Sequence, residues 1–273
     1  MLREVTEQPK DPTHPHFGEE GRRLSYGTYL KVPELIDLQL PLARPEAHDE
    51  LLFIVVHQVY ELWFRQLLFE LDAIREHLFA GRAPQARHLL ERVHEIERVL
   101  VAQVAVLETM TPSDFMDFRR NLAPASGFQS VQFREIEFVS GLKDEGVIAR
   151  LDPQAGEAAR LKRRLGEPTL WDAYCELLTS RGLPMPDDDA DRRRDSLLRM
   201  TRERDRFVDE HAIGEALLTH DELFALWRHR HVLMVERQIG TKSGTGGSAG
   251  APYLRSTLTR RFYPELWDLR SYL

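Results

Sequence analysis

The fold is decided by the stretch from Asp49 to Phe79, which reads DELLFIVVHQVYELWFRQLLFELDAIREHLF. This stretch contains no glycine or proline, is rich in leucine, phenylalanine, glutamate and arginine, and is followed by Gly81. Apolar residues recur in it at intervals of three and four, which is the period of an amphipathic helix. The stretch therefore predicts one long helix with a buried face.

Helical period also dominates the rest of the chain. Pro84 suits the first turn of a second helix that reaches about Met110. Thr111, Pro112 and Asp114 are typical of a helix start, with the threonine as the cap. We expect further helices over 131–142, 168–179, 191–215 and 220–239, the last ending at Gly240. No alternating β segment or repeat stands out, so the sequence predicts an all-α, helical bundle-like fold.

Composition narrows the class of protein. Of the 273 residues, 42% are hydrophobic and 30% charged, which is typical of a globular protein with a sizeable core. The net charge of −7 argues against a nucleic-acid partner. A single cysteine, Cys175, excludes an internal disulfide and a cysteine-based metal centre. The apolar run 51–56 is too short to span a bilayer, and no signal-peptide pattern is present, so we expect a cytoplasmic protein without a membrane partner.

The N-terminus differs from the rest of the chain. Residues 1–22 are polar and contain three prolines, which predicts a flexible arm. The segment from Tyr26 to Leu40 mixes aromatic and aliphatic residues, which indicates that it docks on another surface. We expect residues 23–273 to form one helical domain.

Two histidines, His57 and His231, each lie on the apolar face of a predicted helix, whereas His229 points to the opposite side. A neutral imidazole in an apolar pocket can ligate a haem iron axially. The alternative is a core histidine bonded to a carbonyl or a carboxylate, and spacing alone leaves both open. The apolar neighbours are Phe53, Tyr60 and Phe64 beside His57, and Phe224, Trp227 and Val235 beside His231.

Two further features suit a small zwitterionic ligand. Phe115 and Arg119 are four residues apart and share a helix face, and a guanidinium can grip a carboxylate with two hydrogen bonds. The glycine-rich segment Gly240–Gly250 leaves a helix instead of entering one, so it does not fit a phosphate-binding loop. It fits a segment that closes over a ligand. A surface arginine and a plain connector are the respective alternatives.

Six groups of residues together resemble the tryptophan 2,3-dioxygenase family. They occur in the family's order over nearly the whole chain, from Tyr26 to about Leu266. They are Tyr26–Leu30; 48–58 with Glu61–Trp63; Thr111–Arg119; Ser126–Ser130 with Phe133–Glu137; Trp227–His231; and Gly244–Gly250.

The resemblance implies a cofactor, haem b, held by His231 as the axial iron ligand. Ser126 would lie at the haem edge, and Trp227 shares the face of His231. His57 would lie on the opposite side of the haem, near the indole N–H of the substrate.

The resemblance also implies the substrate site. Phe53 and Phe115 would line the indole pocket, Arg119 would bind the carboxylate, and Thr245 would lie over the ammonium group. Some bacterial members carry tyrosine where this chain has Phe115, so any hydrogen bond from that hydroxyl is absent. Tyr26, Tyr29 and Leu30 match residues that reach a neighbouring subunit's pocket, in a homotetramer built as a dimer of dimers.

The implied reaction inserts both atoms of O2 across the indole C2=C3 bond of L-tryptophan to give N-formylkynurenine, the first step of tryptophan breakdown by the kynurenine route. We expect His57 to position the substrate, because an indole N–H is a very weak acid. The alternatives are a helical haem carrier or gas sensor without turnover, and a related dioxygenase for other indoleamines. A carboxylate clamp and a closing loop favour an enzyme that acts on the free amino acid.

Overall fold

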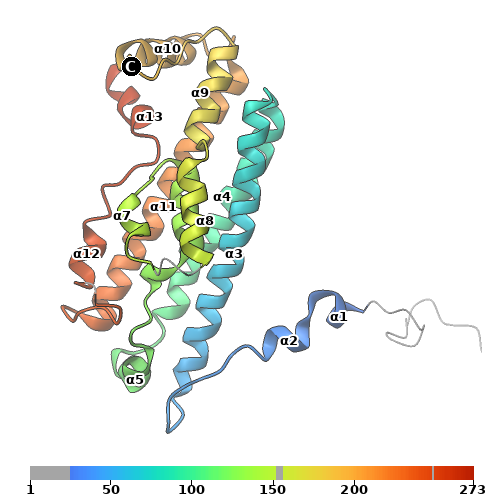
Figure 1. Cartoon of the computed structure of the whole chain (residues 1–273). Coiled ribbons are helices and arrows are strands. Elements are labelled where there is room, and N and C mark those ends of the chain that lie inside the picture. The colour runs from blue at the N-terminus through green and yellow to red at the C-terminus, as the bar shows by residue number, and fades with distance from the viewer. Residues whose placement is uncertain (1–24, 152–155, 248) are drawn as a thin grey trace, which may run out of the picture. The chain divides into compact units, whose positions relative to one another are not determined.

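The computed structural model describes residues 25–151, 156–247 and 249–273. All regular secondary structure within these ranges is helical, which confirms the predicted all-α fold (Figure 1). The chain divides into two compact units, 1–40 and 41–273. The arm predicted over 1–22 lies outside the described residues.

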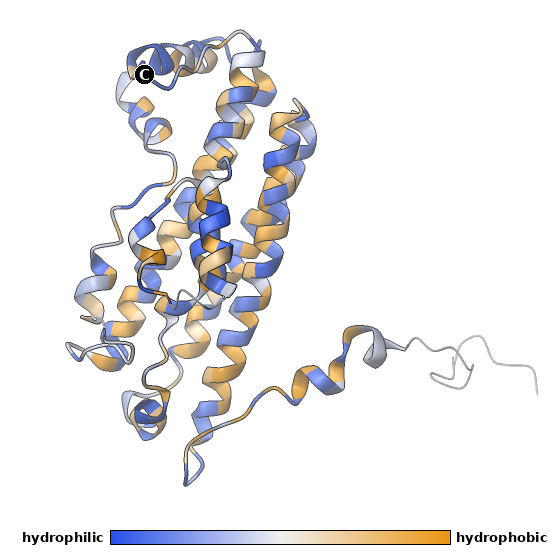
Figure 2. Cartoon of the chain, viewed as in Figure 1, coloured by the Kyte–Doolittle hydropathy of each residue, from blue (hydrophilic) through white to orange (hydrophobic). Residues whose placement is uncertain are grey.

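Three long helices form the frame of the unit 41–273: α3 (His48–Phe79), α4 (Ala83–Leu107) and α11 (Val208–Ile239). α4 packs along both α3 and α11, whereas α3 and α11 make little contact with each other. Figure 2 shows apolar and polar residues interleaved along all three, as expected of amphipathic helices. α3 ends where predicted, and Gly81 follows it with a φ of 69°, a conformation that favours glycine.

Shorter helices surround this frame. The capping box predicted at Thr111 is confirmed: its hydroxyl accepts the Asp114 N–H at 3.2 Å, and the Asp114 carboxylate accepts the Thr111 N–H at 3.1 Å. Helices α7 and α8 were not predicted. The shorter elements are α5 (Pro112–Arg119), η1 (Arg120–Leu122), η2 (Gly127–Gln129), α6 (Val131–Ser140), α7 (Glu145–Ile148), α8 (Gly156–Gly166), α9 (Leu170–Ser180), α10 (Ala190–Arg202), α12 (Ala251–Arg255), α13 (Pro264–Leu269) and η3 (Arg270–Tyr272).

One predicted boundary is wrong. The break expected between 215 and 220 lies inside α11, and the true break falls at 203–207. Thr219 is accommodated inside the helix, with its hydroxyl donating to the Glu215 carbonyl one turn earlier at 3.0 Å. The real turn is made by a charged run in which the Arg206 N–H donates to the Glu203 carbonyl at 2.8 Å.

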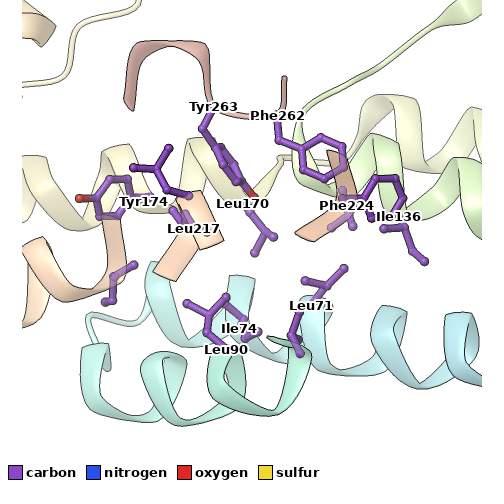
Figure 3. Close-up of a cluster of buried hydrophobic side chains, with 14 of the residues drawn as sticks. Leu71, Ile74, Leu90, Ile136, Leu170, Tyr174, Leu217, Phe224, Phe262 and Tyr263 are labelled. Atoms are coloured by element: carbon purple, nitrogen blue, oxygen red, sulfur yellow. The ribbon is translucent and has the colours of Figure 1, made fainter. Parts of the chain in front are cut away.

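The core is a continuous cluster of buried side chains contributed by the frame helices and by α6, α9, α10 and the C-terminal segment. Burying this apolar surface is the main force that holds the helices together. No helix within the described ranges has an apolar run long enough to cross a bilayer. Figure 3 shows part of the cluster: Leu71, Ile74, Leu90, Ile136, Leu170, Tyr174, Leu217, Phe224, Phe262 and Tyr263.

The unit 1–40 is described from Ser25 onward. Its two helices, α1 (Tyr26–Leu30) and α2 (Val32–Ile36), are separated by Lys31 at a φ of 54° and contain no buried residue. A cluster of exposed apolar side chains is typical of a contact surface. The exposed apolar residues of these helices are Tyr26, Tyr29, Leu30, Leu35 and Ile36.

A buried carboxylate ties the C-terminal segment to α11. Asp221 is fully buried, and its Oδ2 accepts hydrogen bonds from the Phe262 N–H at 2.9 Å and the Tyr263 N–H at 3.2 Å. The indole N–H of Trp267 donates to the same oxygen at 2.9 Å. One side chain therefore satisfies three donors that the fold removes from water.

We predict that Asp221→Leu lowers the free energy of unfolding by roughly 3 kcal/mol or more, because three buried donors lose their acceptor. Thermal unfolding followed by circular dichroism measures this change. Asp268→Leu is the matched control, since Asp268 is exposed in α13, and should stay within about 0.5 kcal/mol of wild type. Equal melting temperatures for the two variants would refute the role of Asp221.

Candidate active site

A cavity of about 300 Å³ lies in the unit 41–273, walled mainly by α3, α4, α6 and α11 and by the segments around α5, α12 and the 240–250 loop. Its size and largely apolar wall are typical of small-molecule sites. Every site residue predicted between 41 and 273 lines it. These residues are Phe53, His57, Phe115, Arg119, Ser126, Trp227, His231 and Thr245.

His57 presents a hydrogen-bond acceptor to the cavity. Its Nδ1 lies 2.7 Å from the Phe53 carbonyl oxygen, one turn earlier in α3. A carbonyl only accepts, so Nδ1 carries the proton and Nε2 keeps its lone pair. Burial lowers the pKa of His57, while the Phe53 carbonyl and Glu61 oppose this to a smaller extent. The ring is therefore neutral at physiological pH.

His231 faces the cavity from α11. Its ring stacks on Trp227 with centroids 5.0 Å apart and an interplanar angle of 7°. Burial lowers its pKa to about 4, with a smaller contribution from His57. A neutral imidazole has a lone pair for a metal. His229, two residues earlier, is exposed, as predicted.

Phe53 and Phe115 line the cavity, and the buried Phe118 packs against both rings. The Phe53 ring lies 5.8 Å from Phe115 in a stacked arrangement, and both rings meet Phe118 edge-on. Flat walls of this kind suit an aromatic ring. Arg119 lies one helical turn beyond Phe115 and donates to the Ser243 carbonyl of the 240–250 loop. An aromatic surface and a guanidinium are therefore combined in one short helix.

An aromatic cluster fills the space between α3 and α11. It consists of rings from α3, α6 and α11 whose neighbouring centroids lie 5.1 to 6.3 Å apart, which is ordinary aromatic packing. The cluster forms part of the cavity wall and excludes water there. Its members are Tyr60, Phe64, Phe133, Phe224 and Trp227.

Three charged residues in the cavity wall were not predicted as site residues. The Glu137 carboxylate accepts from Arg134 at 2.7 Å and from Arg228 at 2.9 Å, and all three side chains are buried. Two guanidiniums share one carboxylate, so the trio carries one excess positive charge. That charge favours an anionic group in the cavity. The available signal was the spacing of Arg134 and Glu137, three residues apart in α6 among apolar neighbours such as Phe133, Ile136 and Phe138.

The comparison with known proteins decides the family. The sequence matches the tryptophan 2,3-dioxygenase family over residues 10–155 and 191–273. The chain belongs to this family. A tryptophan 2,3-dioxygenase of Nocardioides sp. is 55% identical over 94% of this chain and 97% of the relative. Those of Herpetosiphon aurantiacus and Serratia proteamaculans are 44% and 41% identical over 91% and 92% of this chain, and 98% and 93% of their own length.

The residues that line the cavity lie in the part of the sequence that matches the family. Every residue that lines the cavity falls within the ranges that match tryptophan 2,3-dioxygenase. The segment between those ranges contains α8 and α9, which contribute nothing to the lining. Tyr26, Tyr29 and Leu30 belong to the other unit, where they are exposed. Their predicted role at a neighbour's site stays a prediction.

The side chains of the cavity fit a haem. Within the described ranges, no group of three or more histidine, cysteine, aspartate or glutamate side chains is placed to share a metal ion. The cavity instead offers two single neutral imidazoles, His57 from α3 and His231 from α11, on an apolar wall, and one such imidazole suits a metal that brings its own ring of ligands. The excess positive charge of the Arg134–Glu137–Arg228 trio fits the anionic edge of such a ring.

A second arrangement in the core resembles a hydrolytic triad. Ser140 Oγ lies 2.9 Å from His220 Nε2, and His220 Nδ1 lies 2.6 Å from a Glu97 carboxylate oxygen. All three side chains are at most 2% exposed, so no substrate carbonyl can reach the serine. The arrangement joins α4, α6 and α11 and is structural.

Proposed function

We propose that the chain catalyses the dioxygenation of L-tryptophan to N-formylkynurenine, the first step of tryptophan breakdown by the kynurenine route. The observation that carries the proposal is the convergence of His57, His231, Arg119 and an aromatic end wall on one cavity, in a chain 55% identical to a tryptophan 2,3-dioxygenase. A haem carrier or gas sensor has no use for the guanidinium. The lone cysteine suits the reducing cytoplasm.

The cofactor would be haem b, and the His231 imidazole would hold its iron. The lowered pKa of His231 keeps its ring neutral and available to the iron. Trp227 fixes the plane of that ring by stacking, and Ser126 lies at the haem edge. When bound, the haem supplies the activation of dioxygen.

The amino acid binds through groups from three elements. Phe53 and Phe115 hold the indole ring, and Arg119 binds the carboxylate. Thr245 Oγ1 donates its proton to the Ala125 carbonyl at 2.6 Å, which leaves its lone pairs free to accept from the ammonium group. The carboxylate thus meets a cationic donor, Arg119, and the ammonium group meets a hydrogen-bond acceptor, Thr245.

His57 positions the indole and does not act as a base. With its Nδ1 proton held by the Phe53 carbonyl, Nε2 accepts a hydrogen bond from the indole N–H. Full proton transfer is strongly uphill, because an indole N–H is far less acidic than an imidazolium. A neutral acceptor fixes the ring without generating charge in the cavity.

The N-terminal unit completes the site of a neighbouring subunit. Tyr26, Tyr29 and Leu30 expose 78%, 70% and 44% of their surface, more than a chain acting alone would leave to water. We assign them to the pocket of a second copy within a homotetramer, a dimer of dimers. Assembly and substrate binding are then linked.

The first test is the visible spectrum of haem-loaded protein with L-tryptophan under air. Wild type should show a Soret band that shifts on addition of substrate, followed by growth of product absorbance. His231→Ala should lose tight haem binding, because it lacks the axial protein ligand, while His229→Ala should keep it. Full haem content and an unchanged Soret band in His231→Ala would contradict the ligand assignment.

Arg119→Leu should raise the KM for L-tryptophan roughly 100-fold without loss of haem, because a buried carboxylate loses a bidentate partner. Tryptamine has no carboxylate and should lose only the contact between Arg119 and the loop, so its KM should rise much less. Steady-state kinetics with both substrates measure the difference. Equal losses would disprove the clamp.

Subunit mixing tests the shared site. Chains lacking residues 1–30 should bind haem and not L-tryptophan, and His231→Ala chains should be inactive for want of haem. In a mixed oligomer, the arm of a His231→Ala chain can cover the haem site of a truncated chain. Activity should partly return on co-expression. Mixed oligomers without activity would show that the arm serves its own subunit.

A further inference from the structure

The described residues of the 240–250 loop, 240–247 and 249–250, which we call the lid, touch the end of α5 and the segment that follows it at three points. Arg119 donates to the Ser243 carbonyl, and Thr245 Oγ1 donates to the Ala125 carbonyl at 2.6 Å. The third contact is steric, between the backbone of Gly246 and the side chain of Ser126. Polar contacts thus hold the lid on both sides of Gly244, which itself lines the cavity.

The Gly246 contact leaves no room for a side chain. A Cβ placed on Gly246 would lie 2.5 Å from Ser126 Cβ and 3.1 Å from Ser126 Oγ. The first distance is far below normal contact, so either the lid or Ser126 would have to move. The φ of Gly246 lies outside the left-handed region, so its backbone conformation alone is open to other residues. Space, and not backbone freedom, requires glycine here.

We infer that Gly246 is a positioning residue of the reaction, the spacer that lets the lid seat on Ser126 at the depth where Thr245 reaches the cavity. This role of Gly246 in catalysis rests on the proposed function. Relieving the contact takes a retreat of about 1 Å, which carries the Thr245 hydroxyl beyond hydrogen-bonding distance of Ala125. The group proposed to meet the substrate ammonium then leaves its place.

The two ends of the lid are in contact, which prevents the lid from shifting as a whole to make room for a side chain at position 246. A Cβ on Gly250, whose φ is 67°, would lie 2.5 Å from the Lys242 carbonyl oxygen, so the two ends of the lid press against each other. With both ends fixed, a methyl group added at position 246 has to be absorbed where the lid meets Ser126. The effect is therefore local to the seating contact.

The test is a double-mutant cycle between Gly246→Ala and Ser126→Gly in the haem-loaded, full-length enzyme. Gly246→Ala should raise the KM for L-tryptophan about 10-fold or more, with a smaller change in kcat, because one contact to a charged group is lost. In the Ser126→Gly background the same change should cost no more than about twofold, since the atoms in the way are gone. Each comparison is made within one background, so the effect of Ser126→Gly itself cancels.

Gly247→Ala is the matched control. It adds the same methyl group one residue along, where no heavy atom lies within 4 Å, at a φ of +80°. Backbone strain alone should raise KM no more than about fivefold, equally in both backgrounds. A background-dependent effect of Gly247→Ala would overturn the steric argument.

Tryptic cleavage after Lys242, identified by mass spectrometry, reports on lid seating without turnover. Cleavage should be faster in Gly246→Ala than in wild type and should return toward wild type in the double variant. If wild type fails to oxidise L-tryptophan while this pattern holds, the proposed function fails and the seating role stands. Unchanged KM and cleavage in Gly246→Ala, beside an active wild type, would overturn the inference.

Discussion

The site depends on one packing constraint: α3 and α11 both pack along α4, while their own backbones stay apart and meet only through side chains. The space between them would collapse in an ordinary bundle, because apolar faces close on one another. Here the rings of the aromatic cluster, among them Phe133 and Trp227, occupy part of it and hold the walls apart. The histidines of the two helices can then line one cavity from different elements without meeting.

Burial gives similar side chains opposite uses in the two polar regions of the bundle. His220, Ser140 and Glu97 are sealed from water and serve to join three helices. His57 is exposed and His231 is half-buried, and both line the cavity, where a ligand can reach them. Desolvation lowers the pKa of both cavity histidines, so their rings are neutral. Only a neutral imidazole has a lone pair with which to accept a hydrogen bond or to bind a metal.

The sequence predicted those features that follow from local pattern. The length of α3 and the cap at Thr111 are set by nearest neighbours, and the opposite directions of His229 and His231 follow from helical angle alone. The Arg134–Glu137–Arg228 trio was missed because partner choice between α6 and α11 is a tertiary property. The break at 203–207 was also misplaced, because helical period continues through the charged residues that form it.

The contact between the two ends of the lid, at Lys242 and Gly250, lowers the conformational entropy that the lid can lose when a ligand binds. A loop whose ends are free loses many conformations when it orders over a ligand, and that loss weakens affinity. Where the Lys242 carbonyl abuts Gly250, the fold itself brings the two ends of the lid together. For the closure that we propose, part of the ordering cost therefore falls on folding instead of on binding, and a ligand as small as one amino acid needs few contacts of its own to hold the lid.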